Sequence, residues 1–338
     1  MPSDIQPSIT AVVPVRNEEL SVEACIRSLA AQPEIAEIRV VNDGSTDATA
    51  EILARLAGEI PRLRVIDAPP LPPGWVGKNH AAWLGAQNAT TDWLLFTDAD
   101  VRHLPGSARR ALVVAHGSSA ALLSFSPGQL MVTWWEKAVI PFVFTRLAAQ
   151  FSYNRVNDAR TPDAAANGQY LLLRRETYEA IGGHRAVSGE VLEDVALARI
   201  AKAAGHTLHL APGAEIAETR MYSSFPALWE GWTKNLYPLA GGTPWSAALE
   251  LLRALPVAAL AMFALAVWIP PAAFIGAILI MLALLRYALD LRQNRFPASC
   301  IQYWLPGLLL YAAALIVSAG RYSAGSVDWK GRTYPVRS

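Results

Sequence analysis

Residues 8–101 alternate apolar runs with amphipathic segments, and this alternation limits the folds that the chain can adopt. Short runs rich in Val, Ile and Leu are typical of buried strands, and the segments between them have the spacing of helices with one apolar face. Strands that alternate with helices form a parallel sheet covered by helices on both faces. The strands are expected at residues 8–15, 37–43, 62–69 and 92–101, and the helices at 18–32, 48–60 and 77–89.

The pattern is less regular from residue 120 to residue 240, although it still predicts an α/β fold. Strands are expected at 121–127 and 168–175, and a helix at 194–205 that ends at a glycine. Residues 130–151 are apolar and contain two tryptophans, one lysine and one arginine. That composition fits an interfacial helix on a bilayer, and it fits a core helix equally well.

The last third of the chain is strongly apolar. Residues 254–285 contain no charged side chain, and one helix of that length would be about 48 Å long, against a hydrocarbon core of ~30 Å. Pro270 and Pro271 lie near its middle, so two segments joined as a hairpin are expected. A second uncharged run, 296–320, is long enough to span a membrane. The expected division is therefore a cytosolic domain at 1–242, a membrane region at 246–322 and a tail at 323–338, with apolar segments at about 250–269, 271–289 and 297–320.

Composition excludes several classes of protein. The net charge is +1 over 338 residues, which argues against a nucleic-acid partner held by phosphate contacts. Cys25 and Cys300 are the only cysteines, so a disulfide framework is not expected. The segment MPSDIQPSIT lacks the basic region and apolar core of a signal peptide. We therefore expect the first domain to stay in the cytoplasm.

Polar side chains follow the expected strands at the points where they end. Asn17, Asp43, Asp98 and Asp100 occupy these positions, and ligands of such sheets bind outside the carboxyl ends of the strands. Asp98 and Asp100 are two residues apart, which in an extended chain places both carboxylates on one side. Mg²⁺ or Mn²⁺ would relieve their repulsion and join them to substrate phosphates. The alternative is a polar turn with solvated aspartates.

Neighbouring residues have both a functional and a structural interpretation. Asn17 and Glu18 could contact a base and a ribose, or Asn17 could cap the following helix. Asp43 could accept hydrogen bonds from a base or a ribose, whereas Asp47 is expected to cap a helix. Lys78 stands near a helix N-terminus, which is unfavourable for a cation unless an anion such as a diphosphate is close. A solvated lysine is the alternative.

Glu190, Glu193 and Asp194 lie together at the start of a predicted helix. One of these carboxylates could act as a general base for an acceptor hydroxyl. Alternatively, the three acids would only compensate the helix dipole.

Trp229 and Trp232 are three residues apart and could share one helical face near Lys234. Aromatic faces suit a sugar ring or a lipid boundary, and a lysine suits a leaving diphosphate. The structural alternative is a pair of interfacial tryptophans.

Six motifs in a fixed order resemble those of the family 2 glycosyltransferases, which have the nucleotide-diphospho-sugar (GT-A) fold. The motifs are VVPVRNEE, NDGSTD, GKNHA, TDADV, GEVLED and WEGWTKN. The resemblance covers about residues 8–240, and the later motifs with the apolar tail are most similar to the hopanoid- and carotenoid-associated branch near the ceramide glucosyltransferases. The Gln-x-x-Arg-Trp motif of many relatives is absent, and Trp229-Glu-Gly-Trp232-Thr-Lys234 stands in its place.

The resemblance implies roles for particular residues. Asp98 and Asp100 would be the D-x-D motif that binds Mg²⁺ or Mn²⁺, with Asp100 as a direct ligand. Asp194 would be the base, with Glu193 beside it. The nucleotide-sugar would contact Val15, Asn17, Glu18, Asp43, Lys78 and Asp98. The acceptor or leaving-group region would contain Asn167, Gly168, Gln169, Trp229, Trp232 and Lys234.

The expected activity is that of an inverting glycosyltransferase that moves a hexose from a UDP-sugar to a membrane lipid, such as a hopanoid, a carotenoid or a sphingolipid-like acceptor. A multi-pass protein of the cell membrane with a cytoplasmic catalytic domain is expected, and one transfer rather than polymer synthesis. A nucleotidyltransferase is the first alternative, but PVRNEE lacks the glycine- and arginine-rich phosphate loop that it would need. An inactive membrane scaffold is the second, although Asp100 and Asp194 are both present.

Overall fold

The computed structural model describes residues 9–329 and 331–335, which form two compact units. The first unit contains the described residues up to 130 and residues 151–221, and the second contains 131–150 and the described residues from 222 onward. Residues 131–150 and 222–242, which the sequence assigns to the cytosolic domain, thus group with the carboxyl-terminal helices. The segment that lacks signal-peptide features, residues 1–8, lies outside the described residues.

An eight-stranded mixed sheet forms the centre of the first unit, with the order β3-β2-β1-β4-β7-β6-β8-β5. Strands β1 to β4 are parallel, whereas β7 is antiparallel to both β4 and β6, and β5 is antiparallel to β8. The strands are β1 (Ile9–Val15), β2 (Ile35–Asn42), β3 (Leu63–Asp67), β4 (Trp93–Phe96), β5 (Val101–His103), β6 (Leu122–Gln129), β7 (Leu171–Arg174) and β8 (Leu208–Thr219).

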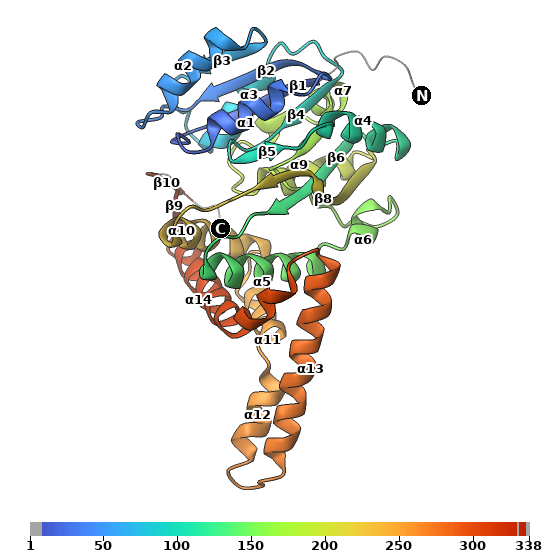
Figure 1. Cartoon of the computed structure of the whole chain (residues 1–338), viewed down its shortest axis with the longest axis vertical. Coiled ribbons are helices and arrows are strands. Elements are labelled where there is room, and N and C mark those ends of the chain that lie inside the picture. Colours follow the sequence, from blue (N-terminus) through green and yellow to red (C-terminus); the bar gives the residue numbers. More distant parts are fainter. Residues whose placement is uncertain (1–8, 330, 336–338) are drawn as a thin grey trace. The chain divides into compact units, whose positions relative to one another are not determined.

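Helices cover both faces of this sheet because its strands are apolar on both sides (Figure 1). Alternate residues of β1, such as Ala11 and Val13, pack with helices α1, α2 and α4, whereas Val12 packs on the opposite face with α3 and α9. The helices of this unit are α1 (Val22–Ala30), α2 (Thr49–Glu59), α3 (Gly77–Ala86), α4 (Ser107–Gly117), α6 (Tyr153–Asn157), α7 (Arg175–Ala180), α8 (Gly183–Ala186) and α9 (Glu193–Ala203).

The α/β fold class is confirmed, and each strand and helix expected between residues 8 and 101 is present. One expectation is wrong: the strand predicted at 92–101 is not continuous. It ends at Phe96, and a turn at 97–100 precedes the short strand β5. The turn is closed by the amide of Val101, which donates to the carbonyl of Asp98 at 3.3 Å.

The second unit is mainly helical. Its elements are α5 (Trp134–Gln150), α10 (Phe225–Leu239), α11 (Pro244–Ala254), α12 (Val257–Leu265), α13 (Ala272–Gln293), the 3₁₀ helix η1 (Ala298–Tyr303), α14 (Trp304–Ser323) and the hairpin of β9 (Ser326–Trp329) and β10 (Arg332–Pro335). Gly307 of α14 lies so close to α5 that an added Cβ would stand 2.4 Å from the carbonyl oxygen of Ala138. Arg146, Glu250 and Tyr311 join α5, α11 and α14 through contacts of 2.8 and 2.9 Å to Glu250 Oε1.

Helix α5 corresponds to the apolar segment expected at 130–151. Its middle residues are buried, including Ile140 and Val143, while Trp134 near its start is 55% exposed. Contacts with α14, η1 and α13 account for burial along this helix within its own unit. Those contacts favour the core-helix alternative for the middle of the segment, and contact of its start with a bilayer stays a prediction.

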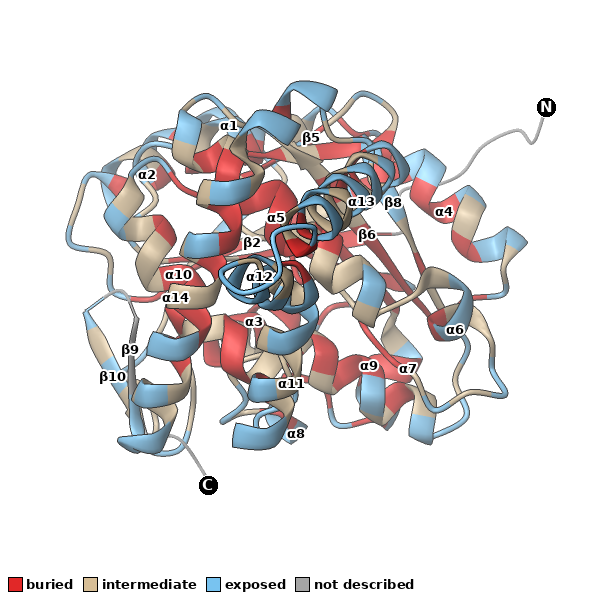
Figure 2. Ribbon diagram, turned by 90° about the horizontal axis from the view of Figure 1, so that it is seen from below, coloured by how far each residue is buried: buried red, intermediate tan, exposed pale blue. Residues whose placement is uncertain are grey.

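The apolar run at 254–285 forms α12 and α13, which turn back on each other at the expected proline pair (Figure 1). Both helices are largely exposed (Figure 2). Within the described part of the chain, α13 and the stretch 298–323 are long and apolar enough to cross a membrane. A third span would require α11 and α12 to act together, although they are bent by 64°.

Gly85 in α3 permits the close approach of that helix to the sheet. A Cβ added there would lie 2.4 Å from Cγ1 of Val12 and 3.1 Å from Cγ2 of Val41. Gly85→Ala should therefore overpack the core and lower the free energy of unfolding by about 1–3 kcal/mol. Gly58→Ala in α2 is the matched control, because no heavy atom lies within 4 Å of its added Cβ and alanine has the higher helix propensity. Melting temperatures of the purified variants measure both effects, and an unchanged value for Gly85→Ala would contradict the packing argument.

Candidate functional site

Two loops at the carboxyl ends of β1 and β2 are joined by hydrogen bonds. Oδ1 of Asn17 accepts from the amide of Thr46 at 2.8 Å, and the amide of Glu18 donates to Oγ1 of Thr49 at 2.8 Å. Asn17 has a φ of 54°, a conformation that asparagine tolerates better than most residues. It does not cap α1, whose N-cap is Ser21. Its side chain therefore fixes the geometry of the two loops.

Asp43 is buried at the end of β2, with 5% of its surface exposed. Its amide donates to the carbonyl of Val15 at 2.9 Å, and Nη1 of Arg16 donates to the carbonyls of Asp43 and Gly44 at 2.5 and 3.1 Å. The Val15 carbonyl is thus already engaged with the neighbouring strand. Asp47 is not the N-cap of α2, which is Ala48, but its Oδ1 accepts from the amide of Thr49, the first residue of that helix, at 3.0 Å.

The two D-x-D carboxylates lie in the turn at 97–100 and not on an extended strand. Asp98 and Asp100 are both partly buried. Since the turn follows the central strand β4, the structure keeps them at the carboxyl edge of the parallel part of the sheet. Both aspartates therefore lie at this edge because of the turn, and not because side chains alternate along an extended strand.

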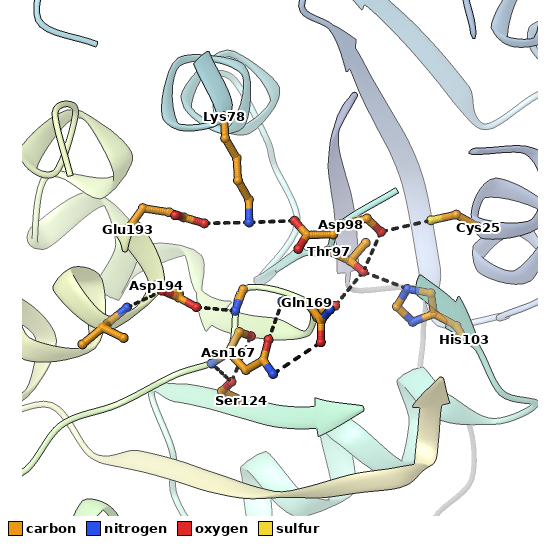
Figure 3. A network of polar contacts seen from close by, with 12 residues as sticks. Cys25, Lys78, Thr97, Asp98, His103, Ser124, Asn167, Gln169, Glu193 and Asp194 are labelled. Carbon is orange, nitrogen blue, oxygen red and sulfur yellow. Dashed lines mark hydrogen bonds and ion pairs between the residues drawn. The ribbon is translucent and has the colours of Figure 1, made fainter. Parts of the chain in front are cut away.

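Lys78 links two acidic parts of the first unit (Figure 3). Its Nζ lies 2.7 Å from Oδ1 of Asp98 and 2.8 Å from Oε1 of Glu193. Burial disfavours the ammonium form, but Asp98, Glu193 and Asp194 outweigh it and raise the pKa of Lys78 well above its ordinary value. Lys78 is therefore a fixed positive charge, and the solvated-lysine alternative does not hold in this structure.

Asp194 begins α9 beside Glu193 and is held by backbone amides. Its Oδ2 accepts from the amide of Gly168 at 2.7 Å, and its Oδ1 accepts from the amide of Val195 at 2.8 Å. Burial raises the pKa of Asp194 to about 6, and the charge of Glu193 adds to the rise while Lys78 opposes it. A carboxylate with a pKa near the working pH is suited to proton transfer.

The turn at 167–169 brings backbone close to these charges. A Cβ on Gly168 would lie 3.1 Å from Nζ of Lys78 and 3.1 Å from Oε1 of Glu193, so only glycine fits without displacing them. Asn167 stabilises the turn through two hydrogen bonds. Its side-chain Oδ1 accepts from the backbone amide of Gln169 at 3.0 Å, and its backbone amide donates to Oγ of Ser124 at 2.7 Å.

Thr97 connects this turn to the end of β4. Its Oγ1 donates to the carbonyl of Gln169 at 2.8 Å and lies 3.2 Å from Nε2 of His103 (Figure 3). Burial lowers the pKa of His103 to about 3, so the imidazole is neutral and can accept or donate one hydrogen bond without adding charge. The Sγ of buried Cys25 contacts the carbonyl of Asp98 at 3.6 Å. These buried groups position the backbone under the charged side chains.

Asn79, next to Lys78, anchors the loop that precedes α9. Its Nδ2 lies 2.8, 3.1 and 2.9 Å from the carbonyls of Val187, Ser188 and Glu190. The helix that carries Lys78 is thereby joined to the segment that carries Glu193 and Asp194.

The sequence analysis quoted Asn79, Arg16 and Thr97 inside motifs but gave them no role. Their position inside a motif, flanked by residues with assigned roles, was the available signal for all three.

The carboxylates of this site can hold a divalent metal ion only if the substrate supplies further ligands to that ion. Within residues 9–329 and 331–335, no group of three His, Cys, Asp or Glu side chains could hold an ion alone. Two carboxylates, Asp98 and Asp100, are available from one turn. Mg²⁺ and Mn²⁺ accept such a set when phosphate oxygens and water complete their shell.

The other predicted residues belong to the second unit. Trp232 on α10 is 3% exposed and packs edge-on against Phe144 and Tyr222, with ring centroids 6.2 Å apart in both pairs. Trp232 is thus a core residue of the second unit and not the interfacial tryptophan of the structural alternative. Trp229 stacks on Phe225, and the carbonyl of Lys234 accepts from the hydroxyl of Tyr322 at 3.0 Å.

Comparisons with known proteins agree with this architecture. The family profile described as "Glycosyl transferase family 2" matches residues 10–182. The 4,4'-diaponeurosporenoate glycosyltransferase of Staphylococcus aureus (strain MRSA252) is 32% identical over 240 residues, which are 70% of this chain and 62% of that protein. This chain thus spans less than two thirds of the length of that relative.

A solved structure, mannosyltransferase PcManGT from Pyrobaculum calidifontis in complex with GDP-Man and Mn²⁺, shares the fold. The TM-score is 0.61 at 20% identity, over 94% of this chain and 87% of that one. The family profile covers half of the chain, and its motifs lie at the carboxyl edge of the sheet. This chain therefore belongs to glycosyl transferase family 2 and is a glycosyltransferase with the GT-A fold.

Proposed function

We propose that this glycosyltransferase transfers a hexose from a UDP-sugar to a lipid at the membrane, with inversion at the anomeric carbon. One observation carries the proposal: Lys78 contacts both Asp98 and Glu193, and Asp194 stands beside Glu193 with a raised pKa. The D-x-D turn and a candidate base are thus joined within one unit. A nucleotide diphosphate and an acceptor oxygen need these two groups on either side of the reacting carbon.

The chemical step is a single displacement. The carboxylate of Asp194 takes the proton of an acceptor hydroxyl while the oxygen of that hydroxyl bonds to the anomeric carbon. The bond from that carbon to the diphosphate oxygen breaks, and UDP leaves with the electron pair. A metal ion held by Asp98 and Asp100 would supply positive charge for the departing diphosphate. Lys78 keeps a second positive charge at the same edge of the sheet.

Nucleotide and acceptor would occupy different parts of the chain. Asn17, Glu18 and Asp43, with the backbone near Val15, would bind the base and the ribose. Gln169 and its neighbours Asn167 and Gly168 would form the floor beneath the sugar or the acceptor. On α10, Trp229 would contact a sugar ring or a lipid, and Lys234 would contact the leaving diphosphate. Trp232 would support these two side chains from within the helical unit.

The acceptor is proposed to be an apolar lipid with one hydroxyl or carboxyl group. The second unit contains two helices long and apolar enough to cross a membrane, which would keep the chain at the cell membrane with its catalytic unit on the cytoplasmic side. The relative named for a carotenoid acid supports a carboxyl acceptor. A carboxylic acid is already ionised at neutral pH, so only a hydroxyl acceptor needs the base.

The proposed base is tested with Asp194→Asn, which keeps the shape but cannot take a proton. Turnover on a lipid alcohol should fall by roughly 10²–10⁴, the range of general base catalysis, whereas binding of UDP should change little. The melting temperature should fall only modestly, because Asn can still accept from one of the two amides of Gly168 and Val195 but not from both. Mass spectrometry of the glycosylated lipid measures turnover, and a rate within a few-fold of the parent on an alcohol would rule out this role.

The pH profile gives an independent test of the same group. Because the pKa of Asp194 is raised to about 6, kcat/KM for a lipid alcohol should be level above that pH. It should fall about tenfold per pH unit below it, since the protonated carboxyl cannot act as a base. Asp194→Asn should lack this limb. A parent profile that stays flat down to pH 4 would contradict the assignment.

Metal dependence is tested at the D-x-D turn. Transfer should require Mg²⁺ or Mn²⁺, and Asp100→Ala should abolish the tight binding of Mn²⁺ that UDP promotes, as followed by electron paramagnetic resonance. Asp92→Ala is the matched control, because Asp92 is exposed just before β4, at the opposite end of that strand. Full activity of the parent in excess chelator would refute a metal requirement.

A further inference from the structure

The hairpin of α12 and α13 has an apolar surface on every side. Exposed residues include Leu260 (54%), Val267 (78%), Trp268 (84%), Phe274 (73%) and Met281 (60%). Exposed apolar area of this extent on a projecting hairpin is typical of contact with lipid. Figure 2 shows α12 as mostly exposed and α13 as a mixture of exposed and intermediate residues with few buried ones.

The uncharged part of neither arm is long enough to reach the far side of a bilayer, although α13 as a whole is long and apolar enough to cross one. Helix α12 has 9 residues and is about 14 Å long. It is preceded by a 64° bend, and α11 before that bend carries Glu250 and Arg253. The uncharged part of α13, residues 272–285, is about 21 Å long, and Arg286 and Asp290 follow it as an ion pair at 3.0 Å. The hydrocarbon core is ~30 Å thick.

The tip of the hairpin has the composition and the backbone hydrogen bonding expected of a segment in an apolar solvent. Residues 266–271 are Ala, Val, Trp, Ile, Pro and Pro, whereas a loop that emerges into water or headgroups normally carries polar residues. Every N–H group of the turn has an acceptor. The amides of residues 266–269 donate to carbonyls of 262, 264 and 265, and those of 272–274 donate to carbonyls of 269–271. Pro270 and Pro271 have no N–H at all, so no backbone donor of the turn is left for water to satisfy.

Small residues allow the two helices to pack without a polar contact. Ala259, Ala272 and Gly276 are the buried residues of the pair outside the base. A Cβ on Gly276 would lie 3.2 Å from the ring of Phe263, so the glycine admits that ring. Close packing through small residues is the usual means of helix association in lipid.

Basic residues mark the base of both arms. Arg253 precedes α12, while Arg286 and Arg292 lie in the last turns of α13, and all three are exposed. Arginine at this level suits anionic headgroups. Both arms therefore have their charged ends at one surface and their apolar ends away from it.

We infer that the α12–α13 hairpin is a re-entrant wedge that inserts into the bilayer from one side and turns back within the hydrocarbon. Its tip at 266–271 lies in acyl chains, and both of its ends stay at the same membrane surface. Of the two helices long enough to cross, α14 with η1 is then the remaining candidate in the described part of the chain. This inference does not depend on the proposed function and would survive its failure.

The depth of the tip tests the wedge directly. Single cysteines are placed at Val267 in the tip and at Leu289 near the base, in the full chain with Cys25 and Cys300 replaced by alanine. They are labelled with an environment-sensitive fluorophore in phosphatidylcholine–phosphatidylglycerol vesicles. Nitroxides near the acyl-chain ends should quench the tip probe at least about twice as strongly as headgroup nitroxides, because the tip lies in hydrocarbon. The order should be reversed at the base.

Access from water separates the wedge from a spanning hairpin. A membrane-impermeant thiol reagent, added outside or trapped inside, should leave Val267→Cys unmodified from either side. Val113→Cys on α4 is the positive control, since Val113 is 58% exposed in the first unit, and it should react from one side. Two results together would overturn the inference and show that the hairpin spans the bilayer. The tip probe would be quenched more strongly by headgroup nitroxides, and Val267→Cys would be modified from the side opposite to the one that modifies Val113→Cys. Tip labelling from the same side as Val113→Cys would show a hairpin lying outside the hydrocarbon and would overturn it equally.

Discussion

The ammonium group of Lys78 joins the acidic groups at the carboxyl edge of the parallel strands. Without it, Asp98, Glu193 and Asp194 would place negative charges close to one another at a partly buried site, and burial makes such repulsion severe. With it, two carboxylates from distant parts of the chain share one cation. The geometry has a further consequence for the donor. A metal–nucleotide complex that approaches Asp98 meets a carboxylate that already has a positive partner, so binding would rearrange an existing ion pair rather than fill a neutral pocket.

The glycine of the 167–169 turn is as important as the charged residues, because it lets backbone reach them. The amide of Gly168 meets Asp194 at 2.7 Å, and the missing side chain leaves Lys78 and Glu193 undisturbed. Beneath it, the neutral imidazole of His103 and the hydroxyl of Thr97 fix the turn without adding charge. Asp194 is thus oriented by backbone and by neutral groups, and its pKa is set by burial and by its charged neighbours.

Local patterns were sufficient to predict the parallel half of the sheet, since each strand from β1 to β4 is an apolar run and a helix lies between each consecutive pair. They were insufficient for the other half, where β7 inserts between β4 and β6 in antiparallel fashion and β5 pairs with β8. These pairings join residues far apart in the sequence. The turn at Asp98 and Asp100 was given only as the alternative, although the apolar run and strand β4 both end at Phe96. The contact of Lys78 with Glu193 was unpredictable, as no local pattern connects positions 78 and 193. Lys78 and Asp194 themselves were found because their positions matched motifs.

The way in which the two units alternate along the chain limits how this enzyme can be truncated, or recombined with others at the level of the gene. Residues 131–150 leave the sheet unit to form α5 with the helical unit, and the chain then returns for residues 151–221. Neither unit is one continuous segment. A gene fragment that ends after α10 would encode α5 and α10 without α14, the helix that packs against both. Exchange of whole domains between genes is therefore difficult at any single crossover point, and the apolar helices and the sheet unit are expected to be inherited together.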